Sequence, residues 1–166
     1  MNPACSLSPA QLLPFFVYGT LLPGQPNAHL WGNAVAQMRP ALFPSGRLYD
    51  MGNFPMLIAG NGRPIPGMLV EVKPQMYDPL IRRLDELEKY NPMQPQHSIY
   101  CREPHAIQAA PNQHTTAWVY VGRDIYVAGK PEILQADWPT YVAARLPDLQ
   151  AWWRHFTSLF PTSPNK

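Results

Sequence analysis

Apolar residues before position 124 occur in short runs that are bounded by proline, glycine or asparagine. Runs of this length, some alternating and some continuous, predict β-strands rather than helices. In HTTAWVYVGR at 114–123, alternation places Ala117, Val119 and Val121 on one face and Trp118 and Tyr120 on the other. Further strands are expected at Phe15–Tyr18, in two runs about a Gly-Asn turn within 46–60, in IPGMLVEV at 65–72 and in SIYCREPHAIQAA at 98–110.

The segment PLIRRLDELEKYNP at 79–92 changes to helical spacing and predicts a short helix. Asp78 as the N-cap and Pro79 at the first helical position indicate its start, and Asn91 followed by proline indicates its end. One apolar stripe runs along this helix and is formed by Leu80, Ile81, Leu84 and Leu87.

The position of Glu88 on this helix is unusual. At about 100° per residue, Glu88 lies at about 80° on the wheel, between Leu84 and Ile81, whereas Glu86 points away from the stripe. A carboxylate in the last turn is also disfavoured by the helix macrodipole. Two interpretations stay open: a functional carboxylate inside a pocket, or a side chain that turns to solvent or pairs with an arginine.

The part of the chain at 136–160 predicts one helix interrupted near Pro147 or two short helices, with Trp152, Phe156 and Leu159 at helical spacing. Strands on both sides of a single central helix predict an α+β fold with a small mixed, barrel-like sheet. We therefore expect a loose leader at 1–13, one domain at 14–138 and a helical C-terminal extension at 139–166 packed on that domain.

Composition narrows the possible functions. The chain has 166 residues, 46% of them hydrophobic, and a net charge of +2, which argues for one globular domain without a nucleic-acid or anionic membrane partner. Two cysteines favour a reducing, cytoplasmic setting over a disulfide framework. The histidines lack metal-ligand spacing and no nucleotide-binding motif is present, so neither a metal nor a cofactor is expected.

The segment VYGTLLPG at 17–24 is a second candidate for the site. It follows an expected strand, and Gly19 would let the backbone turn so that successive N–H groups point into one concavity. Such an arrangement binds anionic oxygens. Many hairpins carry a glycine at this position, so the segment has little specificity on its own.

The sequence contains two motifs that resemble, in the same order, two signatures of the γ-glutamylcyclotransferase-like family. This family includes γ-glutamylamine cyclotransferases and the plant AIG2-like proteins. FVYGTLLPGQPNAHL resembles the opening signature of that family, and LDELEKY resembles its second signature. The segments GRLYDMGNFPMLI, IPGMLVEV, YCREPHAI and AWVYV are similar to its other strands in order and character. The resemblance extends from about residue 15 to residue 138.

The resemblance implies a β-barrel-centred α+β fold and a cyclotransferase that needs no cofactor. The α-amino group of a γ-glutamyl amine or peptide would attack its own γ-carbonyl, which releases 5-oxoproline and an amine. Glu88 matches the catalytic glutamate of the family, as general acid and base. The backbone N–H groups of Tyr18, Gly19, Thr20 and Leu21 would hold substrate oxygens, and Tyr120 would donate a hydrogen bond to the substrate.

Other features leave alternatives open. Tyr100 and Arg102 match a Tyr-x-Arg strand of the family, but Tyr100 could simply pack and Arg102 could pair with Glu88 or Asp85. Glycine commonly follows the catalytic glutamate in this family, whereas Lys89 does here. The "YGTLLPGQPN" likeness favours amines slightly over peptides as the leaving group.

Two competing functions remain besides the enzyme. The same fold could bind a small carboxylate ligand or serve as an interaction module without catalysis. Alternatively, the helix with Trp152 and Trp153 could dock on a partner. The sequence predicts no oligomeric state.

Overall fold

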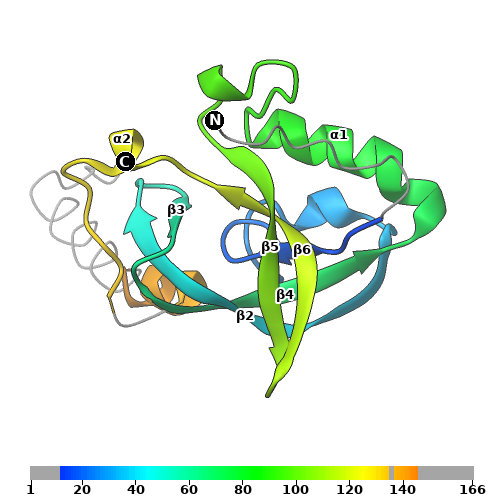
Figure 1. Ribbon diagram of the computed structural model, residues 1–166, viewed down its shortest axis with the longest axis horizontal. Helices are drawn as coiled ribbons and strands as arrows, with labels where there is room; N and C mark the ends of the chain where they lie inside the picture. Colours follow the sequence, from blue (N-terminus) through cyan, green and yellow to red (C-terminus); the bar gives the residue numbers. More distant parts are fainter. Residues whose placement is uncertain (1–11, 135–136, 146–166) are drawn as a thin grey trace, which may run out of the picture.

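The computed structural model describes residues 12–134 and 137–145 of the chain. Strands dominate these residues, and the helices between them are short (Figure 1). In chain order the elements are β1 (Phe15–Val17), η1 (Ala28–Trp31), β2 (Val35–Asp50), β3 (Pro55–Ala59), β4 (Arg63–Val72), η2 (Pro74–Met76), α1 (Tyr77–Leu87), η3 (Pro95–His97), β5 (Cys101–Ala110), β6 (Gln113–Val121) and α2 (Asp124–Val127).

The strands form one sheet in the order β3-β2-β4-β1-β6-β5. The sheet closes into a five-stranded barrel because β2 also pairs with β5, at Leu42 and Gln108. β3 lies outside the barrel and pairs only with the end of β2. β1 runs parallel to β6, and the other pairings are antiparallel. The α+β fold with a small mixed barrel, expected from the sequence, is therefore confirmed.

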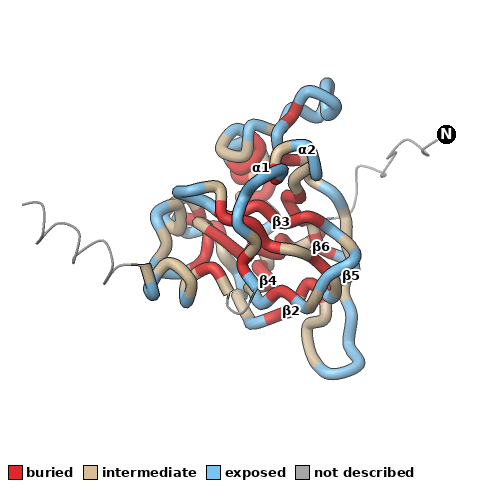
Figure 2. Tube along the Cα trace, turned by 90° about the vertical axis from the view of Figure 1, so that its left-hand side faces the viewer, coloured by how far each residue is buried: buried red, intermediate tan, exposed pale blue. Residues whose placement is uncertain are grey.

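Two groups of buried side chains hold the barrel and α1 together. The buried residues lie at the centre of the molecule in Figure 2. The alternation along β1 separates them: Phe16 packs with side chains from every barrel strand, whereas Phe15 packs with Leu80 and Leu84 of α1. Both leucines are fully buried. At about 25 cal/mol per Å² of apolar surface, each such side chain contributes roughly 1.5–3 kcal/mol to folding.

The predicted faces of the last strand are correct. Ala117, Val119 and Val121 pack in the barrel interior, and Trp118 and Tyr120 face the group that contains α1. The turn between β5 and β6 contains Asn112, which has a positive φ of 59°.

The helix begins earlier than the sequence predicts. Met76 is the N-cap and makes no side-chain capping bond, so Asp78 lies in the first turn and Pro79 is not the first helical residue. The turn of η2 runs directly into α1, so the chain enters the helix without needing a polar cap. The helix also ends before Asn91, at Leu87.

Near the C-terminus, residues 138–145 are helical and rest on the barrel. Trp138 is buried at 2% exposure, and Tyr141 and Arg145 both donate hydrogen bonds to Asp50 at the end of β2. The predicted interruption near Pro147 and the aromatic stripe beyond it lie outside the described residues. Most of the expected leader does too, whereas Leu13 is buried and its carbonyl accepts a hydrogen bond from Tyr77.

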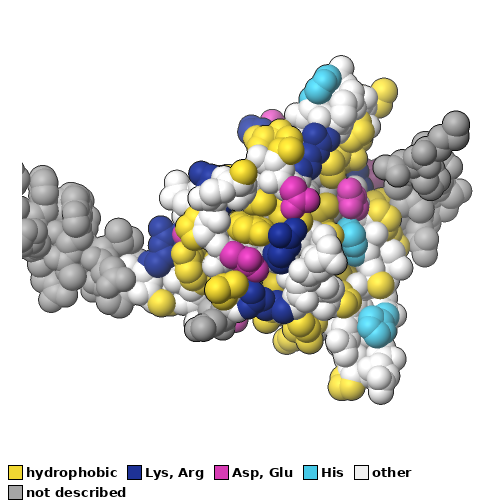
Figure 3. Space-filling model, turned by 60° about the vertical axis from the view of Figure 1, so that its left-hand side comes forward, with side chains coloured by type: hydrophobic (Ala, Val, Ile, Leu, Met, Phe, Trp, Pro, Cys, Tyr) yellow, Lys and Arg dark blue, Asp and Glu magenta, His cyan; other side chains and the backbone are white. Residues whose placement is uncertain are grey.

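The surface has no extended patch of one charge on the face drawn in Figure 3, where basic and acidic side chains lie next to one another. Within 12–134 and 137–145, no helix has the length and apolar character needed to cross a bilayer.

Candidate functional site

A cavity of about 310 Å³ lies between the turn that follows β1 and the C-terminal end of α1. Its walls are mostly apolar or aromatic, and its polar groups are few, as in typical small-molecule sites. The residues that border it are Phe16, Val17, Tyr18, Gly19, Thr20, Leu21, Asn27, Phe54, Pro55, Leu87, Glu88, Lys89, Ile99, Tyr100 and Tyr120. The structure thus brings together every site residue predicted from the sequence.

Glu88 reaches the cavity because of how α1 ends. Lys89 adopts a left-handed conformation with a φ of 53°, and its N–H donates to the carbonyl of Glu86 at 3.2 Å. The N–H of Tyr90 returns to the carbonyl of Asp85 at 2.8 Å. These two bonds form a Schellman motif, in which the left-handed residue is usually glycine. The motif makes Glu88 the C-cap and directs its side chain to the cavity wall rather than along the solvent face.

Burial of the Glu88 carboxyl raises its pKa from 4.5 to about 7. The residue as a whole is half-buried because it borders the cavity, but the carboxyl group itself is surrounded by protein. Desolvation disfavours the charged form, and Lys89, although adjacent in sequence, does not offset that effect. At neutral pH the cavity therefore contains a carboxyl group that can both accept and donate a proton.

The turn after β1 presents unpaired backbone donors. Leu22 donates to the carbonyl of Gly19 at 3.0 Å and closes the turn. In the part of the chain that the structure describes, the N–H groups of Gly19, Thr20 and Leu21 have no hydrogen-bond acceptor. All three residues border the cavity. The arrangement suits the binding of a carboxylate or an oxyanion.

Two residues that the sequence did not single out hold this turn. Asn27 donates from its side chain to Thr20 Oγ1 at 2.9 Å and from its backbone to the Thr20 carbonyl at 2.9 Å. Trp31 donates from Nε1 to the Leu21 carbonyl at 2.9 Å. The donors are therefore fixed before any ligand binds. No pattern in the sequence predicts these contacts, although Asn27 lies within the FVYGTLLPGQPNAHL segment.

Glycine is required at position 19 because the chain packs closely there, not because the turn needs a left-handed conformation. Its φ is not positive, but a Cβ at this position would lie 2.6 Å from Cγ of Pro55. The residue thus permits close approach of the β1 turn to the start of β3, which also borders the cavity.

Three tyrosines border the cavity, and each donates its hydroxyl proton to a protein acceptor. Tyr18 donates to the carbonyl of Tyr120 at 2.7 Å, and Tyr100 donates to the carbonyl of Pro55 at 2.9 Å. Tyr120 donates to Asp85 Oδ1 at 2.7 Å. Burial raises the pKa of all three hydroxyls, and the charge of Glu88 raises it further.

This arrangement changes the role expected for Tyr120. Its proton is directed to Asp85, so its oxygen is available to a ligand as a hydrogen-bond acceptor, not as the donor that the sequence suggested.

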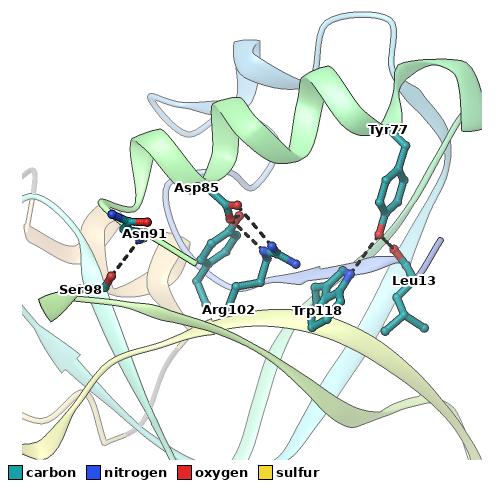
Figure 4. Close-up of polar contacts among 8 residues, drawn as sticks. Leu13, Tyr77, Asp85, Asn91, Ser98, Arg102 and Trp118 are labelled. Carbon is teal, nitrogen blue, oxygen red and sulfur yellow. Dashed lines mark hydrogen bonds and ion pairs between the residues drawn. The ribbon is translucent and has the colours of Figure 1, made fainter. Parts of the chain in front are cut away.

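Asp85 is the buried partner of Arg102, and Figure 4 shows their side chains between α1 and β5. Arg102 donates from Nε to Oδ1 at 2.8 Å and from Nη2 to Oδ2 at 3.3 Å. Its guanidinium also lies over the Trp118 ring, 4.6 Å from the centroid. The sequence left Glu88 and Asp85 open as partners of Arg102. In the structure, Arg102 forms its ion pair with Asp85. The wheel did not predict the burial of Asp85, because its side chain lies at the margin of the apolar stripe.

Among the residues that the structure describes, no group of three or more His, Cys, Asp or Glu side chains could hold an ion.

Comparisons with known proteins agree with the fold. A model of the family described as gamma-glutamyl cyclotransferase, AIG2-like, matches residues 15–140. No protein with a curated description matches the chain significantly.

Several solved structures share the architecture at low sequence identity. YkqA from Bacillus subtilis is 20% identical with a TM-score of 0.56, over 76% of this chain and 39% of YkqA. The uropathogenic E. coli-specific protein c4763 is 14% identical with a TM-score of 0.54, over 79% of this chain and 95% of that protein. An Arabidopsis thaliana protein is 16% identical with a TM-score of 0.54, over 94% of this chain and 89% of its own. Identities this low indicate a shared fold alone.

Proposed function

This chain belongs to the AIG2-like γ-glutamyl cyclotransferase family, and from that premise we propose that it converts a γ-glutamyl amine or γ-glutamyl peptide to 5-oxoproline and a free amine. The observation that carries the proposal is the Glu88 carboxyl, whose pKa is raised to about 7 in a cavity that also borders unpaired backbone donors. A protein that only binds a carboxylate ligand has no need for a buried anion opposite those donors.

The reaction begins with a proton transfer. The α-amino group of the substrate is an ammonium at neutral pH and cannot attack, so Glu88 as carboxylate removes one proton from it. The neutral nitrogen then forms a bond to the γ-carbonyl carbon of the same molecule. Because nucleophile and electrophile share one chain, the cavity mainly enforces a curled conformation.

The tetrahedral intermediate carries a negative charge on the former carbonyl oxygen. The N–H groups of Gly19, Thr20 and Leu21 are suited to stabilise that charge, or to hold the α-carboxylate. The bond from the γ-carbon to the leaving nitrogen then breaks as protonated Glu88 gives its proton to that nitrogen. The attacking nitrogen still carries two protons at this stage, and one of them passes through Glu88 to the released amine, which leaves as an ammonium ion. The products are 5-oxoproline and the amine, and Glu88 is again a carboxylate.

The test is release of 5-oxoproline from a panel of γ-glutamyl amines and γ-glutamyl dipeptides. For the wild type, we expect kcat/KM to rise with pH and to level off above the Glu88 pKa of about 7, because the base must be ionised in the free enzyme. Glu88→Gln should lower kcat/KM by about 10²–10⁴, the usual contribution of a general base.

Glu86→Gln is the matched control, since it removes a carboxylate from the exposed face of the same helix. It should keep its activity. Turnover that persists in Glu88→Gln would disprove the role of Glu88. A wild type that binds 5-oxoproline but releases none from any substrate would favour a non-catalytic binding module on this fold.

A further inference from the structure

Four polar side chains that border the cavity, those of Glu88, Tyr18, Tyr100 and Tyr120, can accept a hydrogen bond from a ligand. The Glu88 carboxylate is an acceptor, and the hydroxyl protons of Tyr18, Tyr100 and Tyr120 are all directed to protein oxygens. Tyr18 also receives a weak bond from the N–H of Leu57 at 3.4 Å, which leaves Tyr120 the better placed of the acceptors. The three hydroxyls lie close enough to Glu88 for its charge to raise their pKa values, so the part of the cavity beside Glu88 is rich in acceptors. Such a place suits a group that only donates, and a primary ammonium is such a group.

The direction of the Tyr120 proton is determined by Asp85. The Asp85 side chain is 12% exposed, and its two oxygens receive hydrogen bonds from Tyr120 and twice from Arg102. An ionised carboxylate can only accept, so the hydroxyl between Asp85 and the cavity has to be the donor in that bond. Arg102 keeps the carboxylate in place, held in turn by its contact with the Trp118 ring (Figure 4).

We propose that Asp85 is a positioning residue, which fixes the Tyr120 hydroxyl so that its oxygen accepts an N–H from a primary ammonium group bound beside Glu88. This rests on the proposed function only in identifying that group as the α-ammonium of a γ-glutamyl substrate. When Glu88 removes one proton, the amine still donates another N–H to Tyr120. That bond orients the nitrogen lone pair, which must point to the γ-carbonyl for attack.

Tyr120 and Arg102 Nε donate to the same oxygen, Asp85 Oδ1, at 2.7 and 2.8 Å. Asparagine at position 85 would keep its amide oxygen there and preserve the bond, whereas alanine removes the acceptor. In Asp85→Ala the tyrosine proton is no longer held by a carboxylate and is free to turn toward the cavity. Asp85→Ala and Tyr120→Phe should therefore weaken the same acceptor by different routes, and Asp85→Asn should not.

The test compares two ligands that differ only in the ammonium group, L-glutamate and glutarate, by calorimetry at pH 8, above the Glu88 pKa of about 7. Wild type should bind L-glutamate at least about tenfold more tightly than glutarate, because hydrogen bonds to charged groups are strong. In Tyr120→Phe, and equally in Asp85→Ala, this preference should fall by about tenfold or more. The double variant should show no further fall, since both changes act on one bond.

Tyr141→Phe is the matched control, because it removes a tyrosine–aspartate bond of 2.8 Å that lies outside the cavity. Its ligand preference should equal that of the wild type. Tyr120→Phe leaves the Asp85–Arg102 pair intact, so it remains informative if Asp85→Ala fails to fold.

An unchanged preference in Tyr120→Phe would overturn the inference, as would additive losses in the double variant or a wild type with no preference. The outcome is independent of turnover. A wild type that prefers L-glutamate in this way but releases no 5-oxoproline would retain the ammonium site and disprove the proposed reaction. Release of 5-oxoproline without the preference would do the opposite.

Discussion

At the scale of single residues, burial of the Glu88 carboxyl suits it to the proposed proton transfer but lowers the stability of the folded protein at neutral pH. Its folded-state pKa of about 7 lies above its ordinary value of 4.5, so the folded state holds its proton more tightly than the unfolded chain does. The contribution of Glu88 to the free energy of unfolding is fully present below pH 4.5 and is lost as the pH rises through 7. The residue that performs the proposed proton transfer therefore destabilises the folded protein at neutral pH.

Glu88→Gln should accordingly stabilise the protein under basic conditions. Relative to the wild type, the free energy of unfolding should increase between pH 4.5 and 7 and then stay constant. The gain should be on the order of 2–3 kcal/mol at pH 8, from the size of the pKa change. Urea unfolding at pH 4 and pH 8 measures it. If the stability of the wild type and of Glu88→Gln changed equally between pH 4 and pH 8, the carboxyl would not be desolvated.

At the scale of elements, the end of α1 depends on an unfavourable residue. Lys89 has a φ of 53°, and its side chain is exposed. The Schellman motif places glycine there in many helices because glycine has no Cβ to clash in the left-handed region. The lysine thus has a strained backbone conformation, and its exposed side chain adds nothing to the core.

Lys89→Gly should raise the free energy of unfolding by up to about 1 kcal/mol, because left-handed strain is relieved and part of the gain is offset by the flexibility of glycine in the unfolded chain. Thermal unfolding of the variant tests this. Lys89→Ala keeps the strain and provides the comparison, so an equal gain in both variants would assign the effect to charge.

The helices and strands also show how much of the fold could be predicted from the sequence. The helix, the hairpin of β5 and β6 and the faces of Ala117 and Trp118 follow from local periodicity, and the structure confirms them. The first half of β2 was missed, because Pro40 and Pro44 interrupt its pattern and a register shift lies between Phe43 and Gly46. The strand order and the β2–β5 pairing that closes the barrel could not be predicted, since pairing between distant strands depends on tertiary packing.

The site shows the same division. The anomalous position of Glu88 on the helical wheel was visible in the sequence, and so was the turn at Gly19. The bonds from Asn27 and Trp31 to that turn and the direction of the Tyr120 proton were not, because each depends on two segments that only the fold brings together. For Tyr120, contact with a substrate stays a prediction, and the structure shows that its hydroxyl donates to Asp85.

At the scale of the whole molecule, Asp50 joins the C-terminal helical residues to the barrel. Its Oδ2 accepts from Tyr141 at 2.8 Å and from Arg145 at 3.1 Å, and its Oδ1 accepts from the N–H of Gly52 at 2.7 Å. The Asp50 side chain is only 10% exposed, so these bonds are shielded from water.

Asp50→Asn should lower the free energy of unfolding by about 1–3 kcal/mol, because the amide cannot accept all of these bonds. Asp124→Asn is the control: it also removes a partner of an arginine, but its side chain is 76% exposed, and such pairs contribute less than about 1 kcal/mol. Urea unfolding compares the two, and equal losses would show that burial of the Asp50 contacts adds nothing.

The place of β1 in the sheet has a consequence for how the protein is made. β1 precedes the other strands in the chain, yet it lies between β4 and β6, and its parallel pairing with β6 joins Phe15 to Trp118. During synthesis the ribosome must release β6 before β1 gains that second neighbour, and contacts between such distant segments form slowly. The turn at Gly19 and the Tyr120 strand therefore meet only late in synthesis, and a nascent chain has no complete cavity until then.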